Sequence, residues 1–176
     1  MKLKSILQER YINLFKDDLK KHIDEIWAML QRAYASLEGG FATASSKQDL
    51  INKTFLTKCV TRNGKIVAVR LYKDAHGRKS IAAATDGSVE GKMGLYKMID
   101  EDILRHRSWG EVSDKMEYIM TKRGGFPIPN IYVKKLLKKD IISLDPDGYH
   151  YTREIAGQPH TKIIFAYDGF VNDMLT

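Results

Sequence analysis

Apolar residues early in the chain recur every three or four positions between Asp17 and Leu37. This spacing places them on one face of a helix. Asp17-Asp18 are predicted to cap its start, and Gly39-Gly40 to end it with a left-handed turn. The predicted apolar face consists of Leu19, Ile23, Ile26, Trp27, Leu30, Tyr34 and Leu37. Residues 1–16 are expected to form an N-terminal extension of uncertain structure.

Strand patterns follow a second, shorter helix. Ser46 and Asp49 have the spacing of a capping box, which predicts that helix. The next two runs, "TFLTKCVTR" and "KIVAVRLYK", are rich in β-branched residues and meet at Asn63-Gly64. This dipeptide tolerates positive φ angles, so the two runs are predicted to form a β-hairpin.

A third antiparallel strand is predicted in "RKSIAAAT", which runs into a glycine-bearing turn. A long helix is predicted beyond the turn, from about Val89 to His106. Strand, glycine turn and helix together can build a backbone cradle for a phosphate, because the first N–H groups of a helix are unpaired. A plain tight turn with Asp86 or Ser88 as the helix N-cap fits the same residues.

The second half of the chain alternates short strands and helices. The patterns predict a strand around "SWGEVS", a helix over Asp114–Lys122, an extended "FPIPN", a short helix over Ile131–Lys138 and a closing hairpin of "GYHYTREIAG" and "HTKIIFAYDG". The order of elements predicts a mixed α+β fold with a central, mostly antiparallel, twisted sheet flanked by helices. We expect one domain over residues 1–176.

Composition narrows the class of protein. The chain has 176 residues, of which 43% are hydrophobic and 29% charged, and no apolar run reaches the length of a membrane span. We therefore expect no membrane partner. Cys59 is the only cysteine, so an internal disulfide is excluded and a cytoplasmic location is expected. A small buried residue is the simplest role for Cys59.

The net charge of +7 favours anionic partners. Six basic residues and no acidic one fall between Lys122 and Lys139, which is typical either of a solvated helix face or of a basic rim beside an anion site. A basic nucleic-acid-binding or inhibitory protein, with Phe126 and Tyr132 as stacking residues, is the alternative function. The basic residues are Lys122, Arg123, Lys134, Lys135, Lys138 and Lys139.

The order of elements resembles the GNAT-type acetyltransferase superfamily. The resemblance is carried by "HIDEIWAMLQRAYASLEGG", "NGKIVAVRLYKD", "SIAAATDGSVEGKMGLYKMIDEDI" and "WGEVSDKMEYIMTKRGGF". It implies an acyl-CoA-dependent N-acyltransferase, with acetyl-CoA as co-substrate and an amine as acceptor. The position at which the family often places a tyrosine as general acid is Thr121 in this chain.

The resemblance also implies which residues bind the coenzyme. The strand before the turn would bond the pantetheine arm through Ala82, Ala83, Ala84 and Thr85. The turn and helix start would take the pyrophosphate through Asp86, Gly87, Ser88, Glu90, Gly91 and Lys92. Gly87 and Gly91 allow close backbone approach and Lys92 adds a cation, whereas Asp86 and Glu90 oppose an anion unless they cap the helix or point away.

Acyl transfer to an amine needs a proton acceptor and a donor to the leaving thiolate. Glu111 is the predicted base, Tyr118 the predicted acid, and Ser113 is predicted to orient a water or donate to the thiolate. The alternatives are a surface or strand-edge glutamate for Glu111, a core tyrosine for Tyr118 and an N-cap serine for Ser113. Tyr34 and Phe41 are predicted on the acceptor side. The five histidines lack metal-ligand spacing, so no metal is expected.

Overall fold

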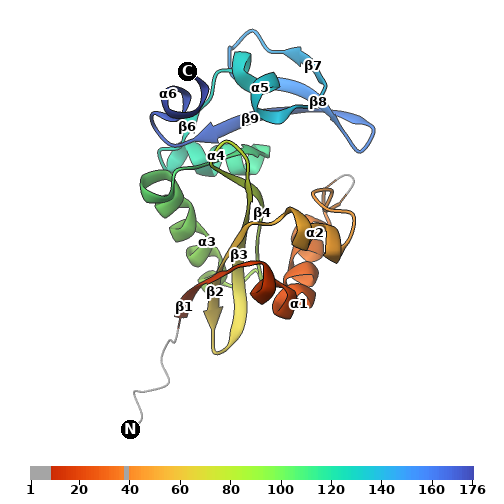
Figure 1. The fold of residues 1–176 in the computed structure, drawn as a ribbon, viewed down its shortest axis with the longest axis vertical. Coiled ribbons are helices and arrows are strands. Elements are labelled where there is room, and N and C mark those ends of the chain that lie inside the picture. Colours follow the sequence, from red (N-terminus) through yellow and green to blue (C-terminus); the bar gives the residue numbers. More distant parts are fainter. Residues whose placement is uncertain (1–8, 38–39) are drawn as a thin grey trace. The chain divides into compact units, whose positions relative to one another are not determined.

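The computed structural model describes residues 9–37 and 40–176 (Figure 1). Its contacts divide the chain into two compact units. The first contains the chain up to Lys73 together with Ile81–Met98, and the second contains Asp74–Ser80 together with Ile99–Thr176. Strand β4 (Arg78–Thr85) contributes to both units. The single domain expected from the sequence stays a prediction.

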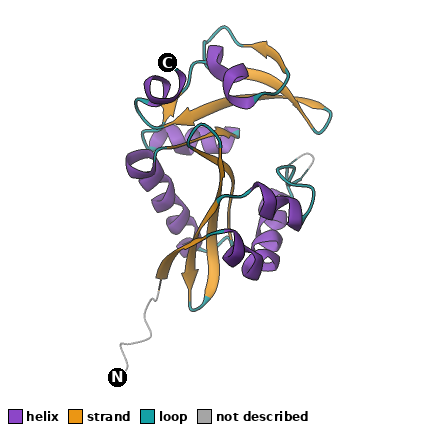
Figure 2. Ribbon diagram, viewed as in Figure 1, coloured by secondary structure: helices purple, strands orange, loops and turns teal. Residues whose placement is uncertain are grey.

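The first unit is built on antiparallel strands. β1 (Glu9–Leu14) pairs with β2 (Leu56–Arg62), and β2 pairs with β3 (Lys65–Asp74), which neighbours β4. Helices α1 (Lys16–Tyr34) and α2 (Lys47–Lys53) lie on one face of these strands, and α3 (Val89–Glu101) lies on the other (Figure 2).

Alternation along β2 and β3 explains why both faces are covered. Cys59 and Val69 are paired in register and belong to the core under α1 and α2. Their neighbours Val60 and Ala68 are also paired and pack with Met98 of α3. Successive side chains of a strand point to opposite faces, so two apolar runs supply two cores. Burial raises the pKa of the Cys59 thiol to about 12, which suits a structural residue.

The start of the chain differs from the sequence prediction. Residues 9–14, expected within an uncertain extension, form β1 along β2. The N-cap of α1 is Phe15, so the prediction that Asp17-Asp18 cap this helix was wrong. Both aspartates lie in its first turn, where negative charge is favourable.

Helix α1 ends at Tyr34 with Ala35 as a right-handed C-cap, so the left-handed end predicted at Gly39-Gly40 was wrong. Leu37, predicted on the apolar face, lies beyond the helix and is 48% exposed. Gly40 has a φ of +61°, and Gly39 lies outside the described residues.

Two local predictions are confirmed. Ser46 is the N-cap of α2, and its hydroxyl accepts a hydrogen bond from the Asp49 N–H at 3.0 Å. The β2–β3 hairpin turns at Asn63-Gly64, with φ angles of +51° and +78°. Two successive positive φ angles define the turn type that asparagine and glycine favour in hairpins.

The second unit has its own sheet. β5 (Ser108–Val112) runs parallel to the start of β4 and antiparallel to β9 (Gln158–Ala166). β8 (Tyr151–Ile155) pairs with β9, β7 (Ile141–Leu144) pairs with β8, and the short β6 (Phe126–Pro127) pairs with β9. The strand order is β1-β2-β3-β4-β5-β9-β8-β7, and the mixed, mostly antiparallel α+β fold is confirmed.

The helices of the second unit agree with the sequence in part. α4 (Asp114–Lys122) has the predicted bounds, and the predicted short helix is a 3₁₀ turn (Asn130–Tyr132) followed by α5 (Val133–Leu137). The helix expected to reach His106 changes to a π-turn over Asp102–His106. β7 and α6 (Phe170–Leu175) were not predicted.

Core residues of this unit come from β5, β8, β9, α5 and α6 and from the segments that follow β6 and β9. They are Trp109, Ile128, Val133, Leu136, Leu137, Tyr151, Ile164, Ala166, Tyr167, Phe170 and Leu175. In the part of the chain that the structure describes, no helix combines the length and apolar character needed to cross a bilayer.

Candidate functional site

Strand β4 places its predicted coenzyme-binding residues beside the predicted acceptor-side residues. Ala82 and Ala84 face the core of the first unit, at 5% and 3% exposure. The Ala83 N–H donates to the Tyr34 hydroxyl at the end of α1, at 3.4 Å. The Tyr34 ring in turn packs edge-on against Phe41, with centroids 5.2 Å apart. The structure thus brings Tyr34, Phe41 and β4 together within one unit.

Part of the β4 backbone already has side-chain partners. The Ile81 carbonyl accepts from the Thr43 hydroxyl at 3.2 Å, and the Ala83 N–H has Tyr34. Burial raises the pKa of Tyr34 despite the opposing effect of the Ala83 N–H, so the phenol stays protonated at neutral pH. A ligand that lies along the β4 backbone would therefore find the Ile81 carbonyl and the Ala83 N–H already bonded to Thr43 and Tyr34.

The turn after β4 is closed by hydrogen bonds among its own residues. Asp86 accepts hydrogen bonds from the N–H and the hydroxyl of Ser88 through one carboxylate oxygen, the first at 2.9 Å. The Ser88 hydroxyl accepts from the Gly91 N–H at 3.0 Å, and the Thr85 hydroxyl accepts from the Gly87 N–H at 3.2 Å. The N–H groups that would cradle an anion are thus largely occupied by side chains of the turn. The predicted capping role of Asp86 and Ser88 fits this arrangement.

Gly91 and Glu90 are fixed by packing and charge. A Cβ on Gly91 would lie 2.5 Å from the Val67 carbonyl oxygen of β3, so this glycine is required for the helix to lie against the strand. The Glu90 carboxylate forms an ion pair with Arg62 of β2. Its own N–H and the Arg62 guanidinium lower its pKa. Glu90 therefore stays ionised and turned toward Arg62.

The residues of the turn fit a diphosphate only in part. Gly87 has a φ of +86° with open space where a Cβ would stand, and Lys92 is an exposed cation. Two residues oppose phosphate binding. The hydrogen bonds that the Asp86 and Ser88 side chains accept at the helix start must break before a phosphate can accept from the same N–H groups. The strand side fits an extended ligand better, because three successive alanines offer little steric hindrance.

Glu111, the predicted base, is the centre of a buried cluster in the second unit. Its carboxylate accepts two hydrogen bonds from Arg153, one of them at 2.7 Å, and one from the Tyr151 hydroxyl at 2.6 Å. Burial alone would raise the pKa of Glu111, but the bonds from Arg153 and Tyr151 outweigh it and lower the pKa. Burial and the neighbouring Glu111 charge raise the pKa of Tyr151. Glu111 is thus ionised but held by two partners.

Ser113 and Tyr118 lie at the start and on the exposed side of α4. Ser113 is the N-cap residue, yet its hydroxyl makes no capping hydrogen bond. Tyr118 is 65% exposed, with the Lys122 ammonium 5.4 Å from its ring centroid, so the alternative of a core tyrosine was wrong. The catalytic roles of both residues stay predictions.

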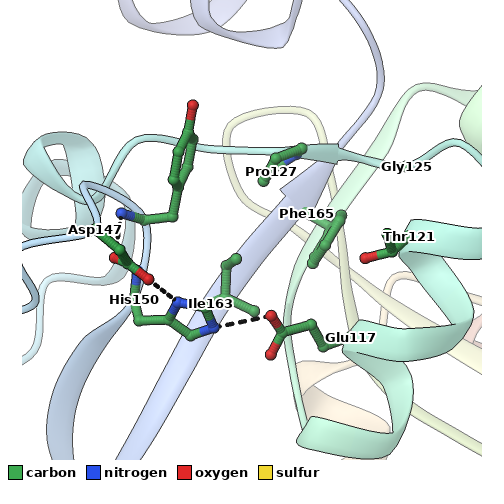
Figure 3. Close-up of a pocket in the computed structure, with 9 residues that line it drawn as sticks. Glu117, Thr121, Gly125, Pro127, Asp147, His150, Ile163 and Phe165 are labelled. Atoms are coloured by element: carbon green, nitrogen blue, oxygen red, sulfur yellow. Dashed lines mark hydrogen bonds and ion pairs between the residues drawn. The ribbon is translucent and has the colours of Figure 1, made fainter.

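A pocket in the second unit contains a histidine between two carboxylates (Figure 3). His150 contacts Glu117 of α4 through Nε2 at 2.8 Å, and Asp147 through Nδ1. Burial alone would lower the pKa of His150, but Asp147 and Glu117 raise it above its usual value. The Tyr149 N–H, together with His150, lowers the pKa of Asp147 to about 2.

Sequence reasoning missed most of these partners. Arg153 follows Tyr151 by two positions in a strand, the spacing of residues on one face, but nothing local links them to Glu111, which is about forty residues earlier. The same holds for Glu117 and His150, on separate elements. Thr121, at the position where the resemblance implies a tyrosine, lines the pocket beside Glu117.

The basic stretch does not form one surface element. Arg123 pairs with Asp100 at 2.6 Å, and Lys135 donates to the Leu175 carbonyl at 2.8 Å. Lys122 lies on α4, whereas Lys135 lies on α5. With these cations divided between elements and partly engaged, nucleic-acid binding is not supported.

Over residues 9–37 and 40–176, no group of three or more histidine, cysteine, aspartate or glutamate side chains could hold a metal ion. The His150 cluster illustrates why. Its two carboxylates contact opposite nitrogens of one ring, so the three groups cannot converge on a single ion.

Comparison with protein-family models and with curated proteins finds no match. Solved structures do match. A GNAT-family acetyltransferase from Streptococcus agalactiae has a TM-score of 0.56 and 11% identity, covering 89% of this chain and 94% of its own. The ribosomal-protein-S18-alanine N-acetyltransferase from Escherichia coli has a TM-score of 0.54 and 17% identity, covering 91% and 93%. A Bacillus subtilis acetyltransferase in complex with CoA has a TM-score of 0.52 and 10% identity, covering 92% and 99%.

Proposed function

We propose, from the GNAT-type acetyltransferase fold that this chain has, that it transfers an acyl group from an acyl-CoA thioester to an amine. The observation that carries the proposal is the fold, which solved acetyltransferases share over about nine-tenths of the chain. The strand of small residues running into a glycine turn and a 13-residue helix supports it. We propose acetyl-CoA as the donor.

The proposed reaction breaks the C–S bond of the thioester and forms a C–N bond to the acceptor. The amine loses a proton and the thiolate leaves, to be protonated. Glu111 stays the proposed proton acceptor because it is ionised. Its lowered pKa makes it a weak base. The water that carries the proton must share the Glu111 carboxylate with the Tyr151 hydroxyl. Ser113, whose hydroxyl does not cap α4, is the proposed orienting group, and Tyr118 the proposed donor to the thiolate.

Coenzyme binding is proposed along Ala82–Thr85 and at the turn Asp86–Lys92. Small side chains on β4 would let the pantetheine arm approach the backbone. Lys92 would supply charge to the pyrophosphate once Ser88 releases the Gly91 N–H. Tyr34 and Phe41 are proposed to border the acceptor, because they pack beside the same strand.

Thermal unfolding with acetyl-CoA tests this proposal, with adenosine 3′,5′-bisphosphate as the control for simple anion binding. Ligand at about 100 times its dissociation constant should stabilise the native state by about 2.7 kcal/mol. Lys92→Glu should abolish the shift, whereas Lys65→Glu, the same charge change at the β2–β3 hairpin, should leave it intact. Equal shifts with acetyl-CoA and the bisphosphate, or none with either, would overturn the proposed function.

A further inference from the structure

The pocket around His150 is lined entirely by residues of the second unit. It has a volume of about 190 Å³, enough for a small organic molecule rather than a cofactor. Its lining comes from α4, the loop between α4 and β6, β6 itself, β9 and the turn before β8. The lining residues are Glu117, Thr121, Gly125, Pro127, Asp147, Tyr149, His150, Ile163 and Phe165.

The charged groups of this pocket are acidic apart from the histidine. Glu117 and Asp147 carry negative charge, and no lysine or arginine is among the nine lining residues. With the imidazole protonated the three groups sum to one negative charge, and with it neutral they sum to two. An anionic ligand is therefore disfavoured, and a cation is favoured.

The two carboxylates are held differently. One oxygen of Asp147 accepts from the N–H groups of Tyr149 and His150, at 2.8 and 2.9 Å, so the turn fixes its position. Glu117 faces His150 from α4 across the pocket (Figure 3), with 32% of its side chain exposed. Asp147 is more exposed, at 47%, but both of its oxygens are engaged, one by the turn and the other by His150. Glu117 contacts His150 through one oxygen, so its bond to His150 is the bond that a ligand cation would replace.

The floor of the pocket is apolar. Ile163 and Phe165 of β9 are 4% and 3% exposed, and Pro127 of β6 lies beside them. Tyr149 adds an aromatic ring that is 41% exposed. Such a floor favours an apolar or aromatic body of the ligand, because burying apolar surface is favourable.

We propose that this pocket binds a small organic monoamine with a compact aromatic body, whose ammonium pairs with Glu117 while the ring lies on Ile163 and Phe165. The inference uses residues of the second unit alone and stands whether or not the chain transfers acyl groups. The ammonium competes with the His150 imidazolium for Glu117. Binding should therefore strengthen as the imidazole loses its proton, since Glu117 and Asp147 are the charged groups facing it.

The test uses phenethylamine as the probe and the full chain labelled for NMR, with the His150 ring resonances as the readout. Phenethylamine should shift these resonances, and its affinity should rise several-fold between about pH 6 and about pH 9, where the amine is still largely protonated. 2-Phenylethanol, which has the same ring but no charge, should not bind. Because the pH comparison uses the unaltered protein, it needs no variant to fold.

Variants complete the test. Glu117→Gln should weaken phenethylamine binding about tenfold, the effect of losing a charge-assisted hydrogen bond. The matched control is Glu154→Gln, which removes the same charge from an exposed position of β8 outside the pocket. Equal binding of 2-phenylethanol, weaker binding at the higher pH, or an unchanged affinity in Glu117→Gln would overturn the proposal.

Discussion

At the scale of single residues, buried charge is the dominant feature of the second unit. Glu111 and Arg153 have side chains only 15% and 12% exposed, and they form a two-bond ion pair. The sequence could single out Glu111 as a carboxylate on a strand. It could not supply Arg153, because the pair depends on how β8 and β5 both lie against β9.

The first prediction concerns this ion pair. Glu111→Gln should lower the free energy of unfolding by about 3 kcal/mol, because it leaves the Arg153 guanidinium buried without its carboxylate. Urea unfolding measures the change. The double variant Glu111→Gln, Arg153→Met should regain part of the loss, since no uncompensated charge remains. A loss below about 1 kcal/mol in the single variant would contradict the assignment.

The second prediction concerns His150. Its folded-state pKa is raised by Asp147 and Glu117, so its contribution to stability is full below the unfolded pKa of about 6.5 and is lost as the pH rises through the folded value. The stability difference between the unaltered chain and His150→Gln should therefore be largest below about pH 6.5 and shrink above it. Urea unfolding at a series of pH values measures this difference.

Two results bear on that prediction. Glu117→Gln should flatten the pH dependence, because one of the two carboxylates that favour the imidazolium is removed. Asp147 contributes in the opposite direction. Its pKa is lowered to about 2, so its contribution is present above about pH 3.9 and is lost as the pH falls toward 2. A pH-independent difference for His150→Gln would refute the pairing.

At the scale of elements, several features that depend on short-range sequence spacing were predicted correctly. The α2 cap, the Asn63-Gly64 hairpin and the bounds of α4 follow from short-range spacing. β1 was missed because only Leu14 of its six residues is buried, so it lacks an apolar alternation. β7 is similar, with three of its four residues exposed. Both strands form because they pair with the backbone of a neighbouring strand, β2 for β1 and β8 for β7.

The third prediction concerns the join between β3 and α3. Alanine at a helical position normally stabilises by up to about 1 kcal/mol relative to glycine. Gly91→Ala should instead destabilise the chain by about 1 to 3 kcal/mol, because the new methyl would lie 2.5 Å from the Val67 carbonyl oxygen. Gly94→Ala, which meets only Val60 side-chain atoms from 3.0 Å, should cost less. A stabilised Gly91→Ala in thermal unfolding would contradict the packing.

At the scale of the whole molecule, each unit has its own core, and one tryptophan lies in each. Trp27 packs against the first core, and Trp109 belongs to the second. The chain passes between the units three times, and β4 contributes to both. Fold class could be predicted from element order, whereas this division could not, because it depends on long-range contacts.

The fourth prediction concerns cooperativity. In Trp27→Phe the remaining tryptophan reports on the second unit, while far-ultraviolet circular dichroism reports on the whole chain. The two signals should give the same urea midpoint, because strands and crossings shared between the units couple their unfolding. Separate midpoints would show that the units unfold independently and that the expected single domain is wrong.

The division of β4 also has a consequence for synthesis on the ribosome. Once Met98 has been synthesised all residues of the first unit are present, but the strand segment that ends at Ser80 belongs to a unit whose other residues, Ile99–Thr176, have not yet been made. At a translation rate of about 5 to 20 residues per second, the stretch Ile99–Thr176 takes roughly 4 to 16 s to make. Until β5 (Ser108–Val112) has also been made, the Arg78–Lys79 edge lacks its partner strand, so the nascent chain is open to mispairing there.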